Sequence, residues 1–195
     1  WHGTYLSIRH RFAEAIAEAE RARDLDPLSL ITQTQVGWIY KFAGRDEDAI
    51  TKYRKVLAVD PDFSYALSHL GGSLMDTGKA GEAVQVLERA VRISRNNPSM
   101  LGALGQAYAM SGRRPQAIQM LARLQRMSKE RYVTPVAGLY VCLGLDNRDC
   151  FFNHLEEAYR QRANYVVLLS VLPSPRRFGA LRVDPRFQDM LRRLQ

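Results

Sequence analysis

A repeat with a fixed period of 34 residues is the feature that most constrains how this chain can fold. Glycine recurs at Gly37, Gly71 and Gly105, each 34 residues after the one before. Four further columns share this spacing: Ala49, Ala83 and Ala117; Gly44, Gly78 and Gly112; Tyr40, Leu74 and Tyr108; and Tyr53, Leu87 and Leu121. Five columns with one period predict a stack of similar structural units, each of which buries its apolar face against its neighbours.

Within one unit, the apolar residues are spaced for two helices joined by a tight turn. Ala49, Tyr53 and Val56 recur every three or four residues, which places them on one face of a helix. Gly44 separates this run from the preceding one, and glycine favours the left-handed conformation that ends many helices. We therefore predict an all-α chain of antiparallel helix pairs. We also expect the Gly37 column to permit a close helix contact with the Ala49 column.

These columns resemble those of the tetratricopeptide repeat family. The second full unit carries the resemblance most completely, in Leu67, Leu70, Gly71, Leu74, Gly78, Ala83, Leu87 and Ala90. The resemblance implies an α-α solenoid, that is, a superhelix of helix pairs with an extended concave surface. It also implies a protein-protein interaction scaffold rather than an enzyme.

The period organises the whole chain, residues 1–195, as one solenoid. We expect a truncated first hairpin at 1–27, full repeats at 28–61, 62–97 and 98–131, a divergent repeat at 132–162 and a C-terminal cap at 163–195. In the divergent repeat, we align Tyr140 and Gly144 with the tyrosine and turn-glycine columns, which requires two extra residues in the turn. In the cap, Phe187, Leu191 and Leu194 share one side of an amphipathic helix that covers the open end of the solenoid.

Two segments resemble the C-terminal repeat region of bacterial signalling proteins, in which a winged-helix regulator, an adenylate cyclase or a serine/threonine kinase domain precedes the repeats. They are Leu181 to Leu194 and Ala15 to Ser29. The resemblance implies that this chain is the regulatory or sensory part of a larger bacterial protein. We expect the chain, which begins with Trp1 rather than Met, to be a fragment of such a protein.

In the family, the first helices of the pairs line the concave surface, and the repeat columns then predict a groove for a ligand. Its residues are Thr34, Trp38, Lys41, Phe42, Tyr65, Ser68, Gly72, Met75, Gln106 and Met110. The aromatic residues are candidate anchors for partner side chains, and the methionines can adapt to varied shapes. Gly72 and Gly102 leave room for a peptide backbone. Packing of Trp38 and Phe42 into the neighbouring hairpin is the alternative.

Signatures of catalysis and of metal binding are missing from the sequence. The four histidines are scattered, and no phosphate loop, nucleophile elbow or zinc-ligand spacing occurs. We therefore expect no enzymatic activity, no cofactor and no metal. Cys142 and Cys150 could approach each other across the fifth hairpin as a thiol switch, but we prefer two packed thiols. Two cysteines in 195 residues fit a reducing compartment, so we expect a cytoplasmic protein.

Charge and hydropathy limit the partners. The longest apolar stretch, Tyr165 to Leu172, is far shorter than the ~20 residues of a membrane helix, so we expect no membrane segment in this chain. The net charge is +8, and 18 of the 28 basic residues follow Ala83. A basic nucleic-acid-contacting module, with Arg176, Arg177 and Arg182 as contacts, is therefore the alternative function. We prefer basic residues that solvate outer helix faces, and we expect a protein or peptide partner.

Overall fold

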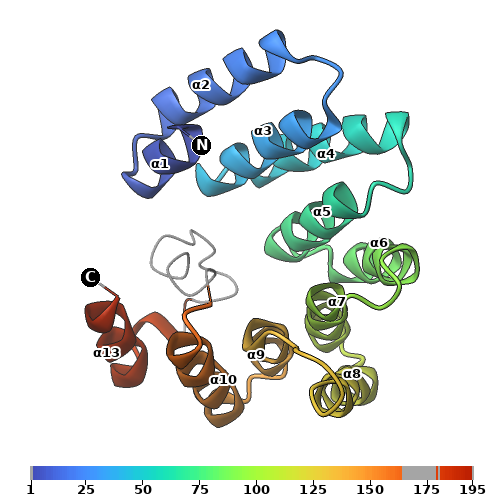
Figure 1. The fold of residues 1–195 in the computed structure, drawn as a ribbon, viewed down its shortest axis with the longest axis vertical. Coiled ribbons are helices and arrows are strands. Elements are labelled where there is room, and N and C mark those ends of the chain that lie inside the picture. Colours follow the sequence, from blue (N-terminus) through green and yellow to red (C-terminus); the bar gives the residue numbers. More distant parts are fainter. Residues whose placement is uncertain (1, 164–178, 180, 195) are drawn as a thin grey trace.

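The fold is an arc of antiparallel helix pairs. The computed structural model describes residues 2–163, 179 and 181–194, and this part contains eleven α-helices and no β-strand. The helices are α1 (His2–Ile8), α2 (Phe12–Leu25), α3 (Leu30–Phe42), α4 (Asp46–Val59), α5 (Ser64–Asp76), α6 (Ala80–Ile93), α7 (Pro98–Met110), α8 (Arg114–Met127), α9 (Pro135–Gly144), α10 (Arg148–Arg160) and α13 (Pro185–Arg193). The pairs follow one another around the arc, and α13 comes round to the same side of the molecule as α1 (Figure 1).

Alternation of the helices places one set of them on the inside of the arc. Figure 1 shows α5, α7 and α9 toward the inside, whereas α6 and α8 lie on the outside. Fully buried side chains such as Tyr53, Leu74, Leu87 and Leu101 form a continuous core between the two sets. The all-α solenoid predicted from the 34-residue period is therefore confirmed.

The first helix of each pair is followed by a residue in the left-handed conformation, and these residues repeat with the period of the sequence. They are His10, Gly44, Gly78, Gly112 and Asp146, with φ between +53° and +82°. The N–H group of the next residue donates to a carbonyl five positions earlier, as from Arg45 to Tyr40 at 2.9 Å. This hydrogen bond closes the end of the helix. The tight turns predicted at the three glycines are confirmed.

The fifth hairpin keeps the same period, which corrects the predicted alignment. The prediction placed the turn at Gly144 and needed two extra residues. In the structure Gly144 is the last residue of α9, and Asp146 adopts the left-handed conformation 34 residues after Gly112. Aspartate tolerates this conformation better than most residues do, so the turn does not require glycine. Because the prediction relied on a glycine, it placed the turn two residues too early.

The glycines inside the first helices meet large side chains rather than the alanine column. A Cβ atom at Gly37 would lie 2.5 Å from the ring of Tyr53, and one at Gly71 would lie 2.6 Å from the Cγ atom of Leu87. The close helix contact is present, but its predicted partner, Ala49, is wrong. Glycine makes room here for the large residue of the second helix, so its cost in helix propensity is offset by core packing.

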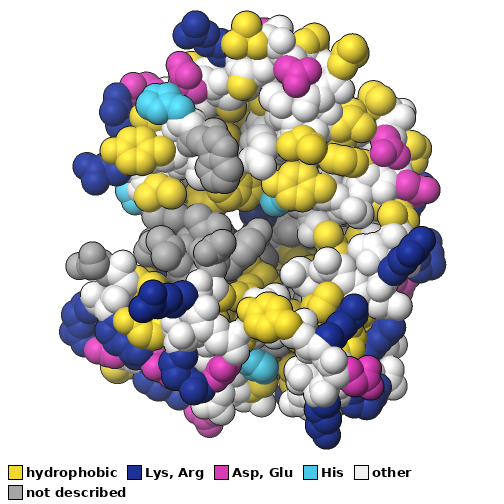
Figure 2. Space-filling view, viewed as in Figure 1, with side chains coloured by type: hydrophobic (Ala, Val, Ile, Leu, Met, Phe, Trp, Pro, Cys, Tyr) yellow, Lys and Arg dark blue, Asp and Glu magenta, His cyan; other side chains and the backbone are white. Residues whose placement is uncertain are grey.

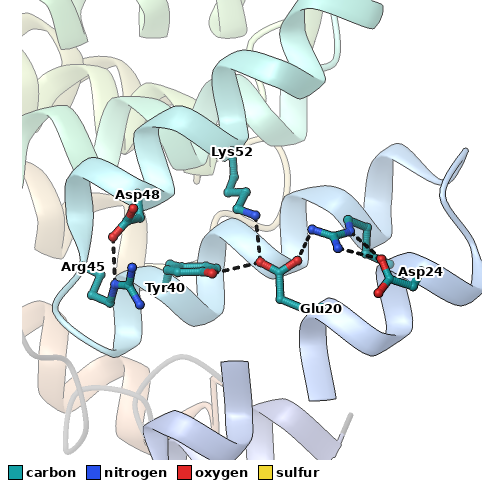
Figure 3. Close-up of polar contacts among 7 residues, drawn as sticks. Glu20, Asp24, Tyr40, Arg45, Asp48 and Lys52 are labelled. Atoms are coloured by element: carbon teal, nitrogen blue, oxygen red, sulfur yellow. Dashed lines mark hydrogen bonds and ion pairs between the residues drawn. The ribbon is translucent and has the colours of Figure 1, made fainter. Parts of the chain in front are cut away.

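Polar contacts among α2, α3 and α4 join the first two hairpins (Figure 3). Glu20 accepts hydrogen bonds from the hydroxyl of Tyr40 at 2.9 Å and from Nζ of Lys52 at 2.7 Å. Burial alone raises the pKa of Glu20, but these hydrogen bonds outweigh it and hold the pKa below its usual value. The contact recurs two periods later, where Tyr108 donates to Glu88 at 2.8 Å. Burial and this hydrogen bond raise the pKa of Tyr108 to about 12.

Helix α13 covers the end of the solenoid, as predicted for the cap. Phe187 is 2% exposed, and its ring centroid lies 6.5 Å from that of Phe151 in α10. Met190, which sequence reasoning missed, is buried as well, whereas Leu191 and Leu194 are only half-buried. Of the predicted cap, the structure leaves undescribed residues 164–178, 180 and 195.

Cys142 and Cys150 form a disulfide between α9 and α10, which corrects the prediction of two packed thiols. Their Cα atoms are 5.6 Å apart, a usual spacing for such a bond. The two residues meet because the tight turn at Asp146 folds α10 back along α9. The cysteine argument for a reducing compartment loses its basis, and the cytoplasmic location stays a prediction.

Candidate functional site

A cavity of about 240 Å³ opens on the inner side of the arc, among α3, α5, α7 and α9. Hydrophobic side chains border part of the hollow at the centre of the molecule (Figure 2). Concave sites with mostly apolar walls and a few polar groups are typical of ligand binding. The residues that line this cavity are Trp38, Lys41, Phe42, Tyr65, Ser68, His69, Gly72, Met75, Ser99, Met100, Ala103, Gln106, Thr134, Val136, Ala137 and Tyr140.

The structure brings most of the predicted groove residues to this one cavity. Met110 lines a neighbouring cavity of about 240 Å³, which shares Gln106 with the first. Thr34 is a correction, because its side chain is fully buried and its hydroxyl donates to the carbonyl of Leu30 at 2.7 Å. A threonine in this position satisfies its hydroxyl within its own helix. The predicted residues in the cavity wall are Trp38, Lys41, Phe42, Tyr65, Ser68, Gly72, Met75 and Gln106.

The aromatic residues of the wall differ in how accessible they are. Phe42 is 2% exposed and packs with its ring centroid 4.3 Å from that of Trp38. Phe42 therefore belongs to the core behind the wall, as the alternative interpretation expected. Met75 and Gln106, each 1% exposed, are corrections of the same kind. Trp38 and Tyr65 are half-buried and keep part of their surface in the groove. The hydroxyl of Tyr65 accepts a hydrogen bond from Nε2 of Gln35 at 2.7 Å, which fixes the ring at the cavity edge.

A second cavity continues the groove toward the N-terminal hairpin. It has a volume of about 510 Å³ and lies among α1, α2, α3 and α5. Trp38, Tyr65 and His69 line both this cavity and the first one. The two cavities therefore form one concave groove that runs from α1 to α9, and these three residues stand at its middle.

Lys41 is held in the wall by carboxylates. Its Nζ atom donates to Oδ2 of Asp76 at 2.5 Å and lies 3.8 Å from Oδ1 of Asp46. Lys41 is 8% exposed, so this ion pair links α3 to α5 beneath the surface of the groove. Gly72 lies beside the ammonium group, since a Cβ there would be 3.4 Å from Nζ. The single lysine of the predicted site is thus engaged within the protein.

His69 is neutral at the middle of the groove. Burial, and to a lesser degree the charge of Lys41, lowers the pKa of His69 to about 3 from 6.5. The imidazole packs edge-on against Tyr65, with ring centroids 4.5 Å apart, and stacks on Tyr53 at 5.8 Å. These aromatic neighbours cover part of the half-buried ring, and the groove presents an uncharged imidazole here.

We expect His69 to make the fold sensitive to acid. Because its folded pKa lies below its unfolded value, the unfolded chain binds more protons between pH 6.5 and about 3. The stability from the neutral imidazole is complete above pH 6.5 and is lost as the pH falls toward 3, by at most about 1.4 kcal/mol per pH unit. Urea unfolding at pH 7 and at about pH 4 should show a smaller loss for His69→Gln than for the wild type. Equal losses would contradict this role.

The period of the sequence also contains signals that were missed. Trp38, Gly72 and Gln106 form one 34-residue column, and its next member is Tyr140, which lines the same cavity. Val136 likewise follows Ser68 by two periods. Extension of the groove columns into the fifth hairpin would have predicted both residues.

Gly102 is a second correction to the groove. It was expected to leave room for a peptide backbone. A Cβ atom at this residue would lie 2.5 Å from the carbonyl oxygen of Ala137, so the space beside Gly102 is taken by α9. The small side chain serves helix packing here and not ligand access.

Basic residues gather away from the groove. In Figure 2 they are concentrated over the C-terminal helices in the lower part of the molecule. Arg193 pairs with Glu156 at 2.6 Å, and Arg186 pairs with Asp149 at 2.9 Å, so part of this charge joins α13 to α10. Two candidate nucleic-acid contacts, Arg176 and Arg177, lie outside the described residues. In the part of the chain that is described, no helix is both long and apolar enough to cross a membrane.

Two family models match the sequence, and both are described as tetratricopeptide repeat. One matches residues 37–98, and the other matches residues 74–132. None of the curated proteins matches the sequence. Neither family model supports the nucleic-acid alternative.

Solved structures show the same fold at low sequence identity. A thermophilic tetratricopeptide repeat protein of Thermus thermophilus, TTC0263, is 18% identical with a TM-score of 0.67, over 97% of this chain and 95% of its own. MamA of Desulfovibrio magneticus RS-1 is 18% identical with a TM-score of 0.59, over 83% and 93%. YrrB, described as a tetratricopeptide repeat protein with an unusual peptide-binding site, is 16% identical with a TM-score of 0.53, over 90% of each chain. At these identities the likeness concerns the fold alone.

Proposed function

We propose that this chain, which tetratricopeptide repeat models match over residues 37–132, is a scaffold that binds an extended peptide segment of a partner protein in its concave groove. The observation that carries the proposal is the continuity of the groove, whose two cavities meet at Trp38, Tyr65 and His69. Proteins of this family are generally scaffolds without enzymatic activity. The description of YrrB, which has a peptide-binding site on the same fold, supports a ligand of this class.

The chemistry of the groove favours a peptide with apolar side chains. Trp38 and Tyr65 offer half-buried rings, which bind such side chains by removing apolar area from water. Half-buried Ser68 supplies a polar group at the same wall, whereas Gln106 is 1% exposed and belongs to the core behind it. Lys41 is engaged by Asp76, so the groove does not present it as a clamp for a terminal carboxylate.

The proposed context is the regulatory or sensory part of a larger bacterial signalling protein. It rests on the resemblance of Leu181 to Leu194 and of Ala15 to Ser29 to the repeat regions of such proteins. A scaffold of this kind acts by holding a partner close to an attached effector domain, so binding and not catalysis is the property to measure.

We expect Tyr65→Ala to weaken peptide binding by about 2 kcal/mol, or about 30-fold, because truncation of a central aromatic anchor has this effect. Ligands can be selected from a random peptide library displayed on phage and then synthesised with a fluorescent label. Fluorescence anisotropy gives the dissociation constant for each variant, and circular dichroism verifies that each variant is folded.

The matched control is Tyr132→Ala. Tyr132 is 71% exposed and lines neither cavity of the groove, so its loss should leave the affinity unchanged. The proposal fails if the folded Tyr65→Ala variant binds the selected peptides as tightly as the wild type. It also fails if Tyr132→Ala weakens binding to the same extent.

A further inference from the structure

Three metal-ligating side chains converge in the fifth hairpin. Cys142 comes from α9, and Cys150 and His154 come from α10. Their ligand atoms all lie within 4.8 Å of one another. Cys150 and His154 are four residues apart, so they occupy the same face of α10. The two helices thus present two sulfur atoms and one imidazole nitrogen to a single point.

A glycine brings the imidazole to this point. Gly138 lies four residues before Cys142 on the same face of α9. A Cβ atom at Gly138 would lie 2.5 Å from Nε2 of His154, so only glycine lets the ring lie against the backbone of α9. Cys142 is fully buried beside a cavity of about 240 Å³, whereas Cys150 and His154 are half-buried.

We propose that Cys142, Cys150 and His154 bind a Zn²⁺ ion when the disulfide is reduced, and that the disulfide and the metal site are alternative states of one cluster. Thiolate and imidazole ligands favour zinc over magnesium or calcium. Ligand atoms of a tetrahedral zinc site lie about 3.5–3.8 Å apart, given zinc bonds of about 2.3 Å to sulfur and about 2.0 Å to nitrogen. Small side-chain rotations therefore suffice to bring the three ligand atoms to these distances. A water molecule completes the fourth coordination position.

The two states interconvert by thiol–disulfide exchange. A dithiol reductant attacks the disulfide, the sulfur–sulfur bond breaks, and two electrons and two protons pass to the cysteines. The products are two cysteine thiols and the oxidised, cyclic form of the reductant. Zn²⁺ then displaces both thiol protons and accepts a lone pair from the neutral imidazole of His154. The oxidised form offers no thiolate, so it should not bind the ion.

Metal binding by the two redox states of the full 195-residue chain tests the proposal. The chain is reduced with dithiothreitol, freed of reductant under nitrogen, and titrated with Zn²⁺ against a chromophoric chelator. We expect one Zn²⁺ per reduced chain and none per oxidised chain. Co²⁺ used as a probe should give a thiolate-to-cobalt charge-transfer band with the reduced chain alone. The absence of this band from the folded, reduced chain would overturn the proposal.

Single variants show whether all three residues are ligands. His154→Gln should lower the affinity for Zn²⁺ by more than the about 10–100-fold that loss of an outer-shell partner costs. His2→Gln, at an exposed histidine, should not change it. The proposal is overturned if the reduced wild type binds Zn²⁺ no more tightly than His154→Gln. Circular dichroism verifies that each variant is folded. The proposal is also overturned if reduction causes a loss of helix that Zn²⁺ does not restore.

Discussion

We expect Phe187→Ala to lower the free energy of unfolding by about 3–5 kcal/mol, because it empties a buried aromatic site between α13 and α10. The ring packs in one cluster with Phe151, Leu155 and Leu181. The ion pairs of Arg193 with Glu156 and of Arg186 with Asp149 also join these helices, but they are exposed to solvent and contribute little. Apolar packing is therefore what holds the cap, and urea unfolding followed by circular dichroism measures the loss.

Val183→Ala is the matched control for the cap. Val183 lies four residues before Phe187 and is 82% exposed, so its truncation should change the free energy of unfolding by less than about 0.5 kcal/mol. A Phe187→Ala chain whose α13 detaches also uncovers the apolar end of the solenoid, and we expect it to self-associate at high concentration. A monomeric Phe187→Ala chain with wild-type stability would show that α13 does not act as a cap.

The solenoid could be predicted from the sequence because several positions of each repeat favour particular residue types. Gly44, Gly78 and Gly112 are visible as a column because glycine adopts the left-handed conformation at no steric cost. The turns at His10 and Asp146 need the same conformation, but other residues fill it there. The requirement is on the backbone, so a search by residue type finds some of the turns and misses others.

The errors in the candidate groove follow from the same cause and from packing. The misplaced turn shifted the fifth hairpin by two residues, which removed Tyr140 from the column of Trp38 and Gln106. Burial of Thr34 and Phe42 depends on what the neighbouring side chains cover, and a repeat column does not specify this. The contact between Cys142 and Cys150 depends on the register of the fifth hairpin as well.

Gly102→Ala should destabilise the protein by about 3 kcal/mol, because the new methyl group meets backbone atoms that cannot rotate away. Its Cβ atom would lie 2.5 Å from the carbonyl oxygen and 2.7 Å from the Cα atom of Ala137. Relief requires α9 to move away from α7, and separation of two packed helices falls at the upper end of what overpacking costs. Because Ala137 and Tyr140 on α9 line the groove, this movement should also weaken peptide binding.

Two other glycine substitutions decide whether the backbone contact is the cause. At Gly71 the nearest atoms belong to the side chain of Leu87, which can rotate, so Gly71→Ala should cost less than Gly102→Ala. Gly81, exposed in α6, has no atom within 4 Å of its added Cβ, so Gly81→Ala should stabilise the helix by up to about 1 kcal/mol. The order of stability in thermal unfolding, from most to least stable, should therefore be Gly81→Ala, the wild type, Gly71→Ala and Gly102→Ala. If Gly102→Ala is no less stable than Gly71→Ala, α9 can yield without loss, and the tight contact of the first helices does not fix the groove.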